Sequence, residues 1–308
     1  MYPREILIGT RGSKLALIQT QEVINLLKRK FPELRFIPRI IVTRGDREED
    51  SDSMERGRFV REIEQALLKG EIDLAVHSLK DLPTELPSGL IISAVPPRRT
   101  SHDAFISVEG KNLDEIAPGS RIGTSSLRRK AQILSFRRDL EVVPLRGNVD
   151  TRIRKLRRGE IDGIVCALCA LERLGLPESG FQKLPHSHFL PSPAQGALGI
   201  EIREDDDSLR EITAEINHPP SFLATRLERE FLKTLKAGCR LPVGVFAQIE
   251  KNMVKMVGAV YLPDGSRWIR VEETVPEREA MGLGKKLADK LLRKGAEEIL
   301  ESSKLLSG

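Results

Sequence analysis

Short apolar runs alternate with amphipathic helical patterns at the start of the chain, and this alternation limits the fold more than any other feature of the sequence. Residues 5–10 indicate a strand, 72–79 indicate a buried strand because they are almost wholly apolar, and 13–31 has the apolar spacing of a helix. A further strand is expected near 35–43 and a further helix at 58–69. This βαβαβ order predicts an α/β fold with a parallel sheet covered by helices.

The same alternation returns after a Pro-rich break at 95–100. Strands are expected near 103–108, 120–123, 140–144 and 162–166, and helices at 125–136 and 148–158. A linker and then another strand are expected within 191–203. The sequence therefore predicts a second α/β unit after the first.

The remainder of the chain has a different pattern. A helix is expected to start near His218-Pro219-Pro220-Ser221 and to end at Gly238. Three apolar runs follow, and Pro263-Asp264-Gly265 predicts a β-turn between the last two. A helix over about 278–301 closes the pattern. This part predicts a smaller C-terminal α/β domain with a three-stranded antiparallel sheet.

At 308 residues the chain is too long for one ordinary core, so two or three domains are expected. We expect domain 1 to span 1–97 plus 197–216, domain 2 to span 98–196 and domain 3 to span 217–308.

The overall charge and aromatic content argue against a nucleic-acid binder. Net charge is only +5, and 4% aromatic residues leave few platforms for stacking bases. The charged N-terminal stretch and the absence of a long apolar segment argue against a secretory signal or a membrane span. Three cysteines do not suggest a disulfide framework. A cytoplasmic location is expected.

Positive charge is instead concentrated in one stretch. Ten arginines fall within 121–158, against only three acidic residues, Asp139, Glu141 and Asp150. The stretch is therefore not expected to be balanced by salt bridges of its own. A guanidinium group offers a flat fork of donors that matches carboxylate or phosphate oxygens. The stretch predicts a site for a strongly anionic ligand.

Three strand-to-helix turns combine small or polar residues with arginine: 9–13, 123–129 and 146–152. Backbone N–H groups and the positive end of a helix dipole meet at such turns, where α/β sheets usually bind ligands. The alternative is that Ser and Thr act there only as N-caps and that the arginines are solvated. Both interpretations stay open on pattern alone.

Candidate acid–base and thiol groups are fewer. Lys80 and Asp81 directly follow an apolar strand, although a turn-forming Asp is the commoner explanation, and His77 is expected to be a packed strand residue. Cys239 lies between Lys236 and Arg240, where positive charge favours the thiolate, although a buried thiol is the safer interpretation.

A metal site is not expected. Cys166 and Cys169 form a C-x-x-C pair, and His186 and His188 could in principle complete four zinc ligands. Their spacing is poor and the cysteine flanks are apolar, so core thiols are favoured over zinc.

Together the motifs are far more specific than any one alone. They are, in chain order, RGSKLAL, VTRGD (42–46), AVHSLKDLP (75–83), GTSSLRR, LRGNVDTR, ALERLGL (170–176), AQGALGIE (194–201) and AGCRLPVG (237–244). On these motifs the sequence closely resembles the porphobilinogen deaminases, also called hydroxymethylbilane synthases, of tetrapyrrole (heme) biosynthesis. The resemblance covers all three expected domains.

The resemblance implies a transferase that joins four porphobilinogen molecules head to tail, with loss of ammonia, into the linear tetrapyrrole hydroxymethylbilane. It implies two periplasmic-binding-protein-like α/β domains and a third α/β domain, in a monomer. It also implies a dipyrromethane cofactor, assembled from substrate, which is bound through a thioether to Cys239 in domain 3 and primes the growing chain. Domain 1 would be the active-site half, and domain 2 the arginine-rich half.

The family's site residues carry over by motif position. Asp81 matches the catalytic aspartate, which would stabilise the cationic methylene-pyrrole formed when ammonia leaves. The residues expected to bind the cofactor are Cys239, Lys80, Asp81, Ser126, Arg128, Arg129 and Arg146. Those expected to bind substrate are Arg11, Ser13, Gln19, Thr124, Arg146, Arg152, Arg173 and Gln195.

Two other classes of function are alternatives to the enzyme. A non-catalytic anion-binding module would explain the arginines and the two α/β units, but not Cys239. RNA binding through 121–158 is disfavoured by the low aromatic content. The substrate porphobilinogen is the partner expected, with no nucleic acid and no membrane.

Overall fold

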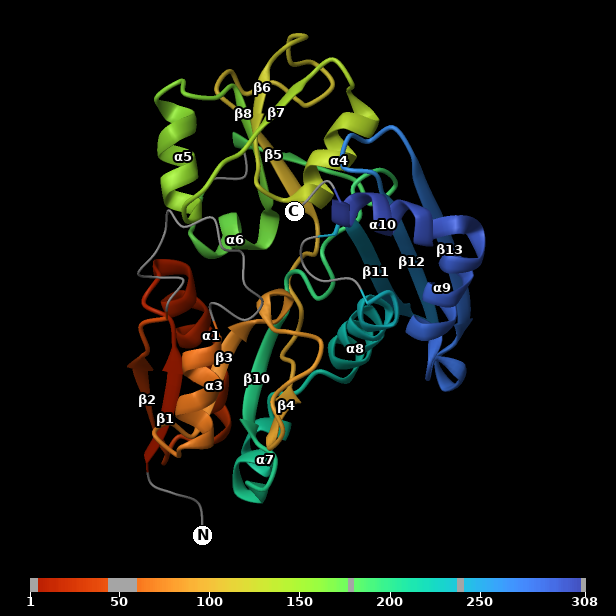
Figure 1. The fold of residues 1–308 in the computed structure, drawn as a ribbon. Helices are drawn as coiled ribbons and strands as arrows, with labels where there is room; N and C mark the ends of the chain where they lie inside the picture. The colour runs from red at the N-terminus through yellow and green to blue at the C-terminus, as the bar shows by residue number, and fades with distance from the viewer. Residues whose placement is uncertain (1–4, 44–59, 177–179, 237–240, 306–308) are drawn as a thin grey trace. The chain divides into compact units, whose positions relative to one another are not determined.

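The computed structural model describes residues 5–43, 60–176, 180–236 and 241–305 (Figure 1). The chain forms two compact units. The first comprises Met1–Arg99 with Gly196–Leu223, and the second comprises Thr100–Gln195 with Ala224–Gly308. The chain therefore leaves the first unit after Arg99, returns at Gly196 and leaves again within α8 (Pro219–Thr234). The division of the second unit into domains 2 and 3 stays a prediction.

The first unit is built on a five-stranded sheet of order β2-β1-β3-β10-β4. Its elements are β1 (Glu5–Thr10), α1 (Lys14–Lys30), β2 (Arg35–Ile40), α3 (Arg61–Leu68), β3 (Leu74–Ser78), the 3₁₀ turn η1 (Leu79–Asp81), β4 (Leu90–Ala94), β10 (Leu198–Arg203) and α7 (Asp207–Ala214). Strands β2, β1 and β3 are parallel neighbours, whereas β10 runs antiparallel to both β3 and β4.

The two faces of this sheet carry separate apolar cores. On one face Ile6, Ile8 and Val76 pack with α1 residues such as Val23 and Leu27. On the other, Ala75 and Ile72 pack with Ile63 and Leu67 of α3. Because both faces are covered, the central strands are apolar on both sides, as the sequence pattern predicted.

The second unit contains a five-stranded sheet of order β7-β6-β8-β5-β9. Its elements are β5 (Asp103–Ser107), β6 (Arg121–Gly123), α4 (Leu127–Phe136), β7 (Glu141–Val143), α5 (Val149–Arg157), β8 (Gly163–Ala167), α6 (Leu168–Arg173) and β9 (Gln182–Lys183). Here β7, β6 and β8 are parallel, and β5 runs antiparallel to β8 and β9.

Three neighbouring strands of each sheet are parallel as expected, and both sheets depart from the parallel pattern in the same way. The fourth strand of each sheet is antiparallel, and in each case it is the first strand after the chain crosses from the other unit. A strand that arrives by such a crossover is not tied to the hand of a local βαβ connection. The α/β class is confirmed by the mixed sheet of each unit, and the likeness to periplasmic binding proteins stays a prediction.

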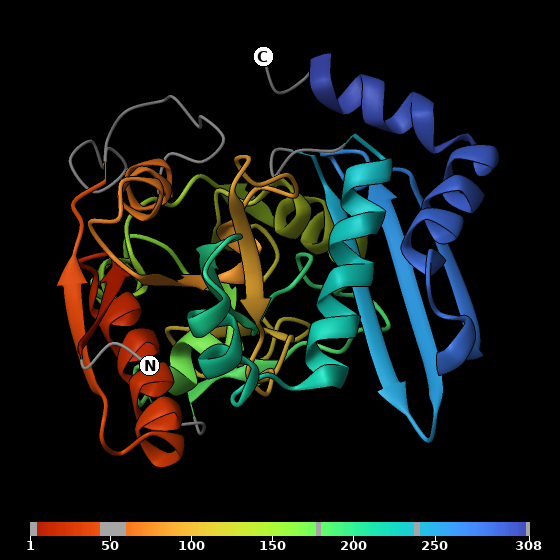
Figure 2. The same cartoon turned by 90° about the horizontal axis from the view of Figure 1, so that it is seen from below.

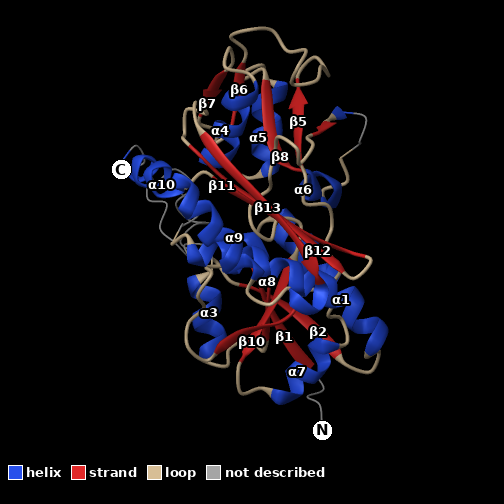
Figure 3. Cartoon of the chain, turned by 90° about the vertical axis from the view of Figure 1, so that its right-hand side faces the viewer, coloured by secondary structure: helices blue, strands red, loops and turns tan. Residues whose placement is uncertain are grey.

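The second unit also holds the expected three-stranded antiparallel sheet. It is formed by β11 (Val243–Glu250), β12 (Met253–Tyr261) and β13 (Trp268–Pro276), seen as long strands in Figures 2 and 3. Helix α8 lies along one face, so close that a side chain at Gly258 would meet the ring of Phe231. On the other face Ala259 and Tyr261 pack with Ala131 of α4, within the same unit.

One continuous C-terminal helix was expected, but the structure shows an interrupted one. It is divided into α9 (Leu283–Leu291), the π-helical η4 (Leu292–Ala296) and α10 (Glu297–Leu305), after the short 3₁₀ turn η3 (Glu277–Glu279). Gly295 has φ 89° and ψ 21°, a left-handed conformation that interrupts the helix. The expected turn before β13 is confirmed, since Gly265 has φ 70° and donates to the carbonyl of Leu262 at 2.9 Å. Among the described residues, no helix is both long and apolar enough to span a bilayer.

Candidate active site

In the first unit, five expected site residues lie at one edge of the sheet. Strands β1 and β3 are parallel neighbours, so their carboxyl ends share that edge. Arg11 and Ser13 follow β1, and Lys80 and Asp81 form η1 after β3. Gln19 of α1 is held at the same edge, because its Nε2 donates to Oγ of Ser78, the last residue of β3, at 2.8 Å.

Asp81 presents an exposed carboxylate on an anchored backbone. The neighbouring Leu79 and Leu82 are 1% and 3% exposed, and the backbone N–H of Leu79 donates to the carbonyl of Ala197 at 3.1 Å. The N–H of Leu82 closes the turn onto the carbonyl of Leu79 at 3.3 Å. Buried leucines on both sides therefore hold the carboxylate at the end of the strand while leaving it accessible.

In the second unit, the expected residues also gather at one sheet edge. Thr124 and Ser126 follow β6, Arg146 follows β7, and α6, which ends at Arg173, follows β8. These three strands are parallel neighbours. Residue 103, at the start of antiparallel β5, pairs with Ala167 at the end of β8 and so lies at this edge too.

The three polar turns do cap helices. Ser13 Oγ accepts from the N–H of Ala16 at 3.3 Å, Ser126 Oγ from Arg129 at 3.4 Å, and Asn148 Oδ1 from Thr151 at 3.0 Å. One side chain satisfies only part of the first helical turn, and α1 and α4 have no acidic residue there. The capping role is confirmed for Ser13 and Ser126, but the expectation of solvated arginines is wrong for Arg128 and Arg129, which are buried. One cap leaves further N–H groups and the positive helix end for an anion.

Two arginines of the stretch, Arg128 and Arg129, are paired with a carboxylate from outside it, which the sequence did not lead us to expect. Asp103, which lies outside the stretch in sequence, is fully buried and pairs with both. Its Oδ2 lies 2.8 Å from Nη1 of Arg128, and its Oδ1 lies 2.7 Å from Nη2 of Arg129. Burial by itself would raise the pKa of Asp103, but the two guanidinium groups outweigh it and hold that pKa well below its usual range. Arg137 is also paired, with Asp139.

Three further arginines expected at the site follow the parallel strands of this edge. Arg152, on α5, donates from Nε to the carbonyl of Gly147 at 2.8 Å. Burial, and then the positive charge of Arg129, lower the pKa of Arg152. Arg173 is 8% exposed at the end of α6, and Arg146 is half-buried after β7. A like-charged cluster of this kind favours an anionic ligand.

Gln195 is 0% exposed and bonded within the second unit. Its Nε2 donates to the carbonyl of Ser101 at 2.8 Å and to Oδ1 of Asp103 at 2.9 Å. Its role as a substrate-binding residue stays a prediction, as do the roles of the other expected site residues.

The cysteines and histidines fall as follows. Cys239 lies outside the described residues, and Cys166 and Cys169 are buried in the core as expected. His77 is a packed strand residue, 5% exposed. In the described ranges, no group of three or more His, Cys, Asp or Glu side chains could hold a metal ion.

Sequence reasoning missed Asp103, Glu64 and Glu201. Each carboxylate is at most 6% exposed. Asp103 opens the apolar run DAFIS, and Glu201 interrupts the apolar run LGIEIR. A charge inside a buried strand is a usable signal, because such a group needs a partner, although the pattern does not say which one.

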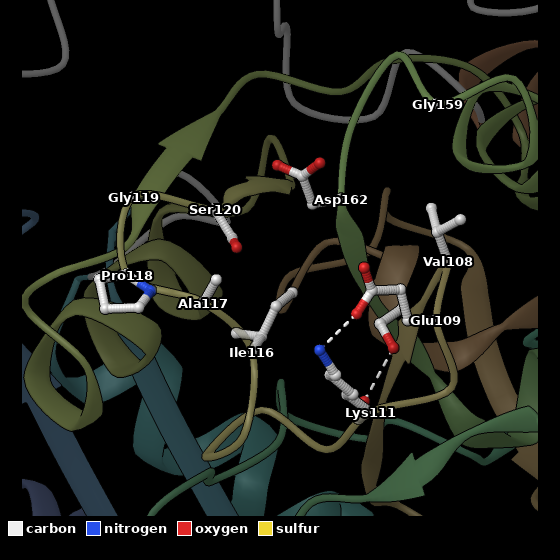
Figure 4. A pocket seen from close by; sticks show the side chains of 11 residues that line it. Val108, Glu109, Lys111, Ile116, Ala117, Pro118, Gly119, Ser120, Gly159 and Asp162 are labelled. Carbon is white, nitrogen blue, oxygen red and sulfur yellow. Dashed lines mark hydrogen bonds and ion pairs between the residues drawn. The ribbon is translucent and has the colours of Figure 1, made fainter.

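A pocket of about 460 Å³ lies at the opposite edge of the second unit's five-stranded sheet (Figure 4). It is lined by Ser107 at the end of β5, Ser120 before β6 and Asp162 before β8, among others. None of the expected site residues lines it.

Comparison with known proteins shows the family of the chain. Residues 6–211 match the family described as porphobilinogen deaminase, dipyromethane cofactor binding domain, and residues 222–293 match the C-terminal domain of the same enzymes. A porphobilinogen deaminase of Thermus thermophilus is 48% identical over 96% of this chain and 98% of its own. One of Desulforudis audaxviator is 45% identical over 96% and 97%.

Among solved structures, the methionine-binding protein MetQ aligns over 74% of this chain and 91% of its own, at 15% identity and a TM-score of 0.44. The relatives of known sequence, by contrast, match nearly from end to end. Two profile matches and two relatives above 40% identity over almost the whole length place this chain in the porphobilinogen deaminase family.

Proposed function

We propose that Asp81 is the catalytic residue of this chain, and that the two sheet edges bind the carboxylates of cofactor and substrate. The family joins four porphobilinogen molecules head to tail, with loss of ammonia, into hydroxymethylbilane, and the chain is a transferase of this kind. The observation that carries the assignment is the exposed carboxylate of Asp81 on a buried, hydrogen-bonded strand end. The end of the neighbouring strand supplies Arg11 and the N-terminus of α1.

The donors at the two edges fit a dipyrromethane cofactor. Each pyrrole ring carries an acetate and a propionate, so two linked rings bring four carboxylates. Guanidinium groups, N-cap hydroxyls and unsatisfied helix N–H groups are the donors that such groups require. By motif position the cofactor would be held by Lys80, Asp81, Ser126, Arg128, Arg129 and Arg146, with Cys239 as its attachment point. When bound, the cofactor supplies the primer to which substrate rings are joined.

Asp81 would act on charge that develops during the reaction. When ammonia leaves porphobilinogen, positive charge spreads over the pyrrole ring and its methylene group, and a fixed carboxylate that accepts from the pyrrole N–H stabilises it. Preorganised charge of this kind contributes about 3–4 kcal/mol at comparable sites. Asp81 could also move a proton, because the amine leaves more readily when it is protonated.

The remaining polar residues would bind and orient the substrate. Those proposed are Arg11, Ser13, Gln19, Thr124, Arg146, Arg152, Arg173 and Gln195. Each added ring brings two more carboxylates, which explains why one chain concentrates so many arginines without binding nucleic acid. The monomeric state and the cytoplasmic location expected above stay predictions.

Intact-protein mass spectrometry tests the proposal, with the parent chain compared with Cys239→Ser. The parent is expected to carry added mass equal to two linked pyrrole units, and Cys239→Ser is expected to carry none. A parent chain without added mass is next incubated with porphobilinogen. If it then gains no mass and releases no ammonia, the enzyme assignment is wrong and an anion-binding module is the better description.

A further inference from the structure

One carboxylate holds both arginines at the start of α4. Asp103 accepts from Arg128 at 2.8 Å, from Nη2 and Nε of Arg129 at 2.7 and 3.2 Å, and from Gln195 at 2.9 Å. No solvent reaches the carboxylate, and the two arginines are 5% and 7% exposed. A group so placed fixes both guanidinium planes together.

The two arginines keep unequal numbers of N–H groups for a ligand. Arg129 uses all three nitrogens on the protein, since Nη1 donates to the carbonyl of Val165 at 3.2 Å in addition to the contacts with Asp103. Arg128 uses only Nη1, which lies near Asp103, Gln132 Oε1 and the carbonyl of Leu190. Nε and Nη2 of Arg128 donate to no described residue.

The charge count follows from the same contacts. Two guanidinium groups and one carboxylate leave a net charge of one positive unit. A second anion at this point would therefore meet one uncompensated positive charge, held in a fixed orientation. Arginine in a fixed fork binds a carboxylate better than a freely rotating cation does, because less freedom is lost on binding.

A strained turn at Ala194 also supports the carboxylate of Asp103, through Gln195. Ala194 has φ 59°, which is uncommon for a residue with a side chain, and its N–H donates to Oε2 of Glu228 at 2.6 Å. Glu228 is fully buried and also accepts from the N–H of Ala247 at 2.8 Å. The turn holds Gln195 against Asp103, which shows that the surroundings determine this geometry closely.

We infer that Asp103 is a positioning residue for ligand binding: it orients Arg128 and Arg129 so that the remaining N–H groups of Arg128 meet a carboxylate of the cofactor or substrate. The inference rests on the proposed function, since it requires that a pyrrole carboxylate binds at this edge. Asp103 itself is not proposed to contact the cofactor or the substrate.

The alternative is that Asp103 only stabilises the fold, and two substitutions separate the two roles. Asp103→Asn removes the charge but keeps the size, and it turns an amide donor toward one of the guanidinium groups. Asp103→Glu keeps the charge and is expected to fold, but it shifts the carboxylate by one methylene. The matched control is Asp162→Asn, in the same unit at the opposite sheet edge, where Oδ2 accepts from the N–H of Arg121 at 2.7 Å (Figure 4).

Three quantities are measured on each variant: urea unfolding, the rate at which apoprotein incubated with porphobilinogen gains the mass of two pyrrole units, and KM against kcat. Asp103→Asn and Asp103→Glu are expected to load about tenfold more slowly and to raise KM about tenfold, with kcat changed much less, because binding is weakened equally in ground and transition states. Asp162→Asn is expected to load and to turn over like the parent.

The outcome that overturns the inference is a folded Asp103→Glu with the loading rate and KM of the parent. If Asp103→Asn does not fold, Asp103→Glu alone decides in the same way. A parent chain that gains no mass refutes the proposed function instead, so the two failures are distinguishable.

Discussion

Nε2 of His77 lies 2.9 Å from Oε2 of Glu201, and both side chains are buried in the first unit. They are diagonal neighbours on the face of the sheet that α3 covers, since His77 pairs with Gly199 and Glu201 with Ala75. Glu64 of α3 is also buried, and its Oε1 has no hydrogen-bond partner among the residues that the structure describes. Burial, and then the charge of Glu201, raise the pKa of Glu64 to about 7, with His77 opposing the shift.

This raised pKa predicts a pH-dependent stability. The unfolded chain releases the Glu64 proton near 4.5, and the folded chain releases it near 7. The stability linked to this proton is therefore fully present below pH 4.5 and is lost as the pH rises to about 7. Glu64→Gln, which cannot release a proton, is expected to be more stable than the parent by about 2 kcal/mol above neutral pH.

Urea unfolding at pH 5 and pH 8 checks this expectation. The gain should be present at the higher pH and almost absent at the lower one. Glu71→Gln, at an exposed position shortly after α3, serves as the control. An equal effect of Glu64→Gln at both pH values would show that Glu64 does not hold a proton in the folded chain.

Asp81→Asn should keep the cofactor but lose turnover. The amide has nearly the shape of the carboxylate but no charge to stabilise the cationic methylene-pyrrole, so kcat is expected to fall by about 100-fold or more. Steady-state kinetics and intact mass are measured together. Asp73→Asn is the control, because Asp73 lies at the other end of the same strand and accepts from the N–H of Leu7 at 2.7 Å. Near-normal turnover in Asp81→Asn excludes Asp81 as the catalytic residue.

Gly147→Ala should destabilise the turn between Arg146 and α5. Gly147 has φ 100°, and an added Cβ would lie 2.8 Å from Cγ2 of Thr151. The combined strain and contact are expected to lower the free energy of unfolding by about 1–3 kcal/mol.

Gly159→Ala is the matched comparison for Gly147→Ala, in the same unit. Gly159 also has a positive φ, 69°, but nothing lies within 4 Å of the added Cβ. Its smaller loss of stability isolates the contribution of the contact with Thr151. If Gly147→Ala and Gly159→Ala lower the free energy of unfolding equally, a shift of Thr151 relieves the contact.

Asp103→Ala should be among the more destabilising substitutions in the second unit. It leaves two buried guanidinium groups without their carboxylate, and the loss of one partner of a buried ion pair costs about 3–5 kcal/mol. Asp139→Ala breaks the pair with Arg137 at an exposed position, where solvent screens the charges, and is expected to matter far less. Chemical denaturation of both variants checks the difference, and equal losses would contradict it.

Local features of the fold could be predicted because their causes are local. Apolar runs of strand length identified β1 and β3 close to their observed bounds. Helical spacing and polar turn residues did the same for the three capped helices, α1, α4 and α5. The turn at Gly265 and the three-stranded sheet followed from the same kind of evidence. Strand β4 and helices α6 and α7 were not expected, because they are short and their patterns are weak.

The site residues came from motif order, and the structure shows how the fold gathers them at two sheet edges. Parallel neighbours end at the same edge, which is why Arg11 and Asp81 share one, far apart as they are in sequence. The partners of these residues could not be read in the same way. Asp103 lies 25 and 26 positions from Arg128 and Arg129, and no spacing rule links them.

The sequence by itself determined the family and the α/β class and supplied the site residues proposed here, because these depend on residue type, order and local periodicity. Tertiary structure alone decided the antiparallel fourth strand of each sheet, the pairing of one buried carboxylate with two arginines, and the shared burial of Glu64, His77 and Glu201. The physical reason is that a buried charge or a strand edge is satisfied by whatever the fold brings beside it, over any separation along the chain.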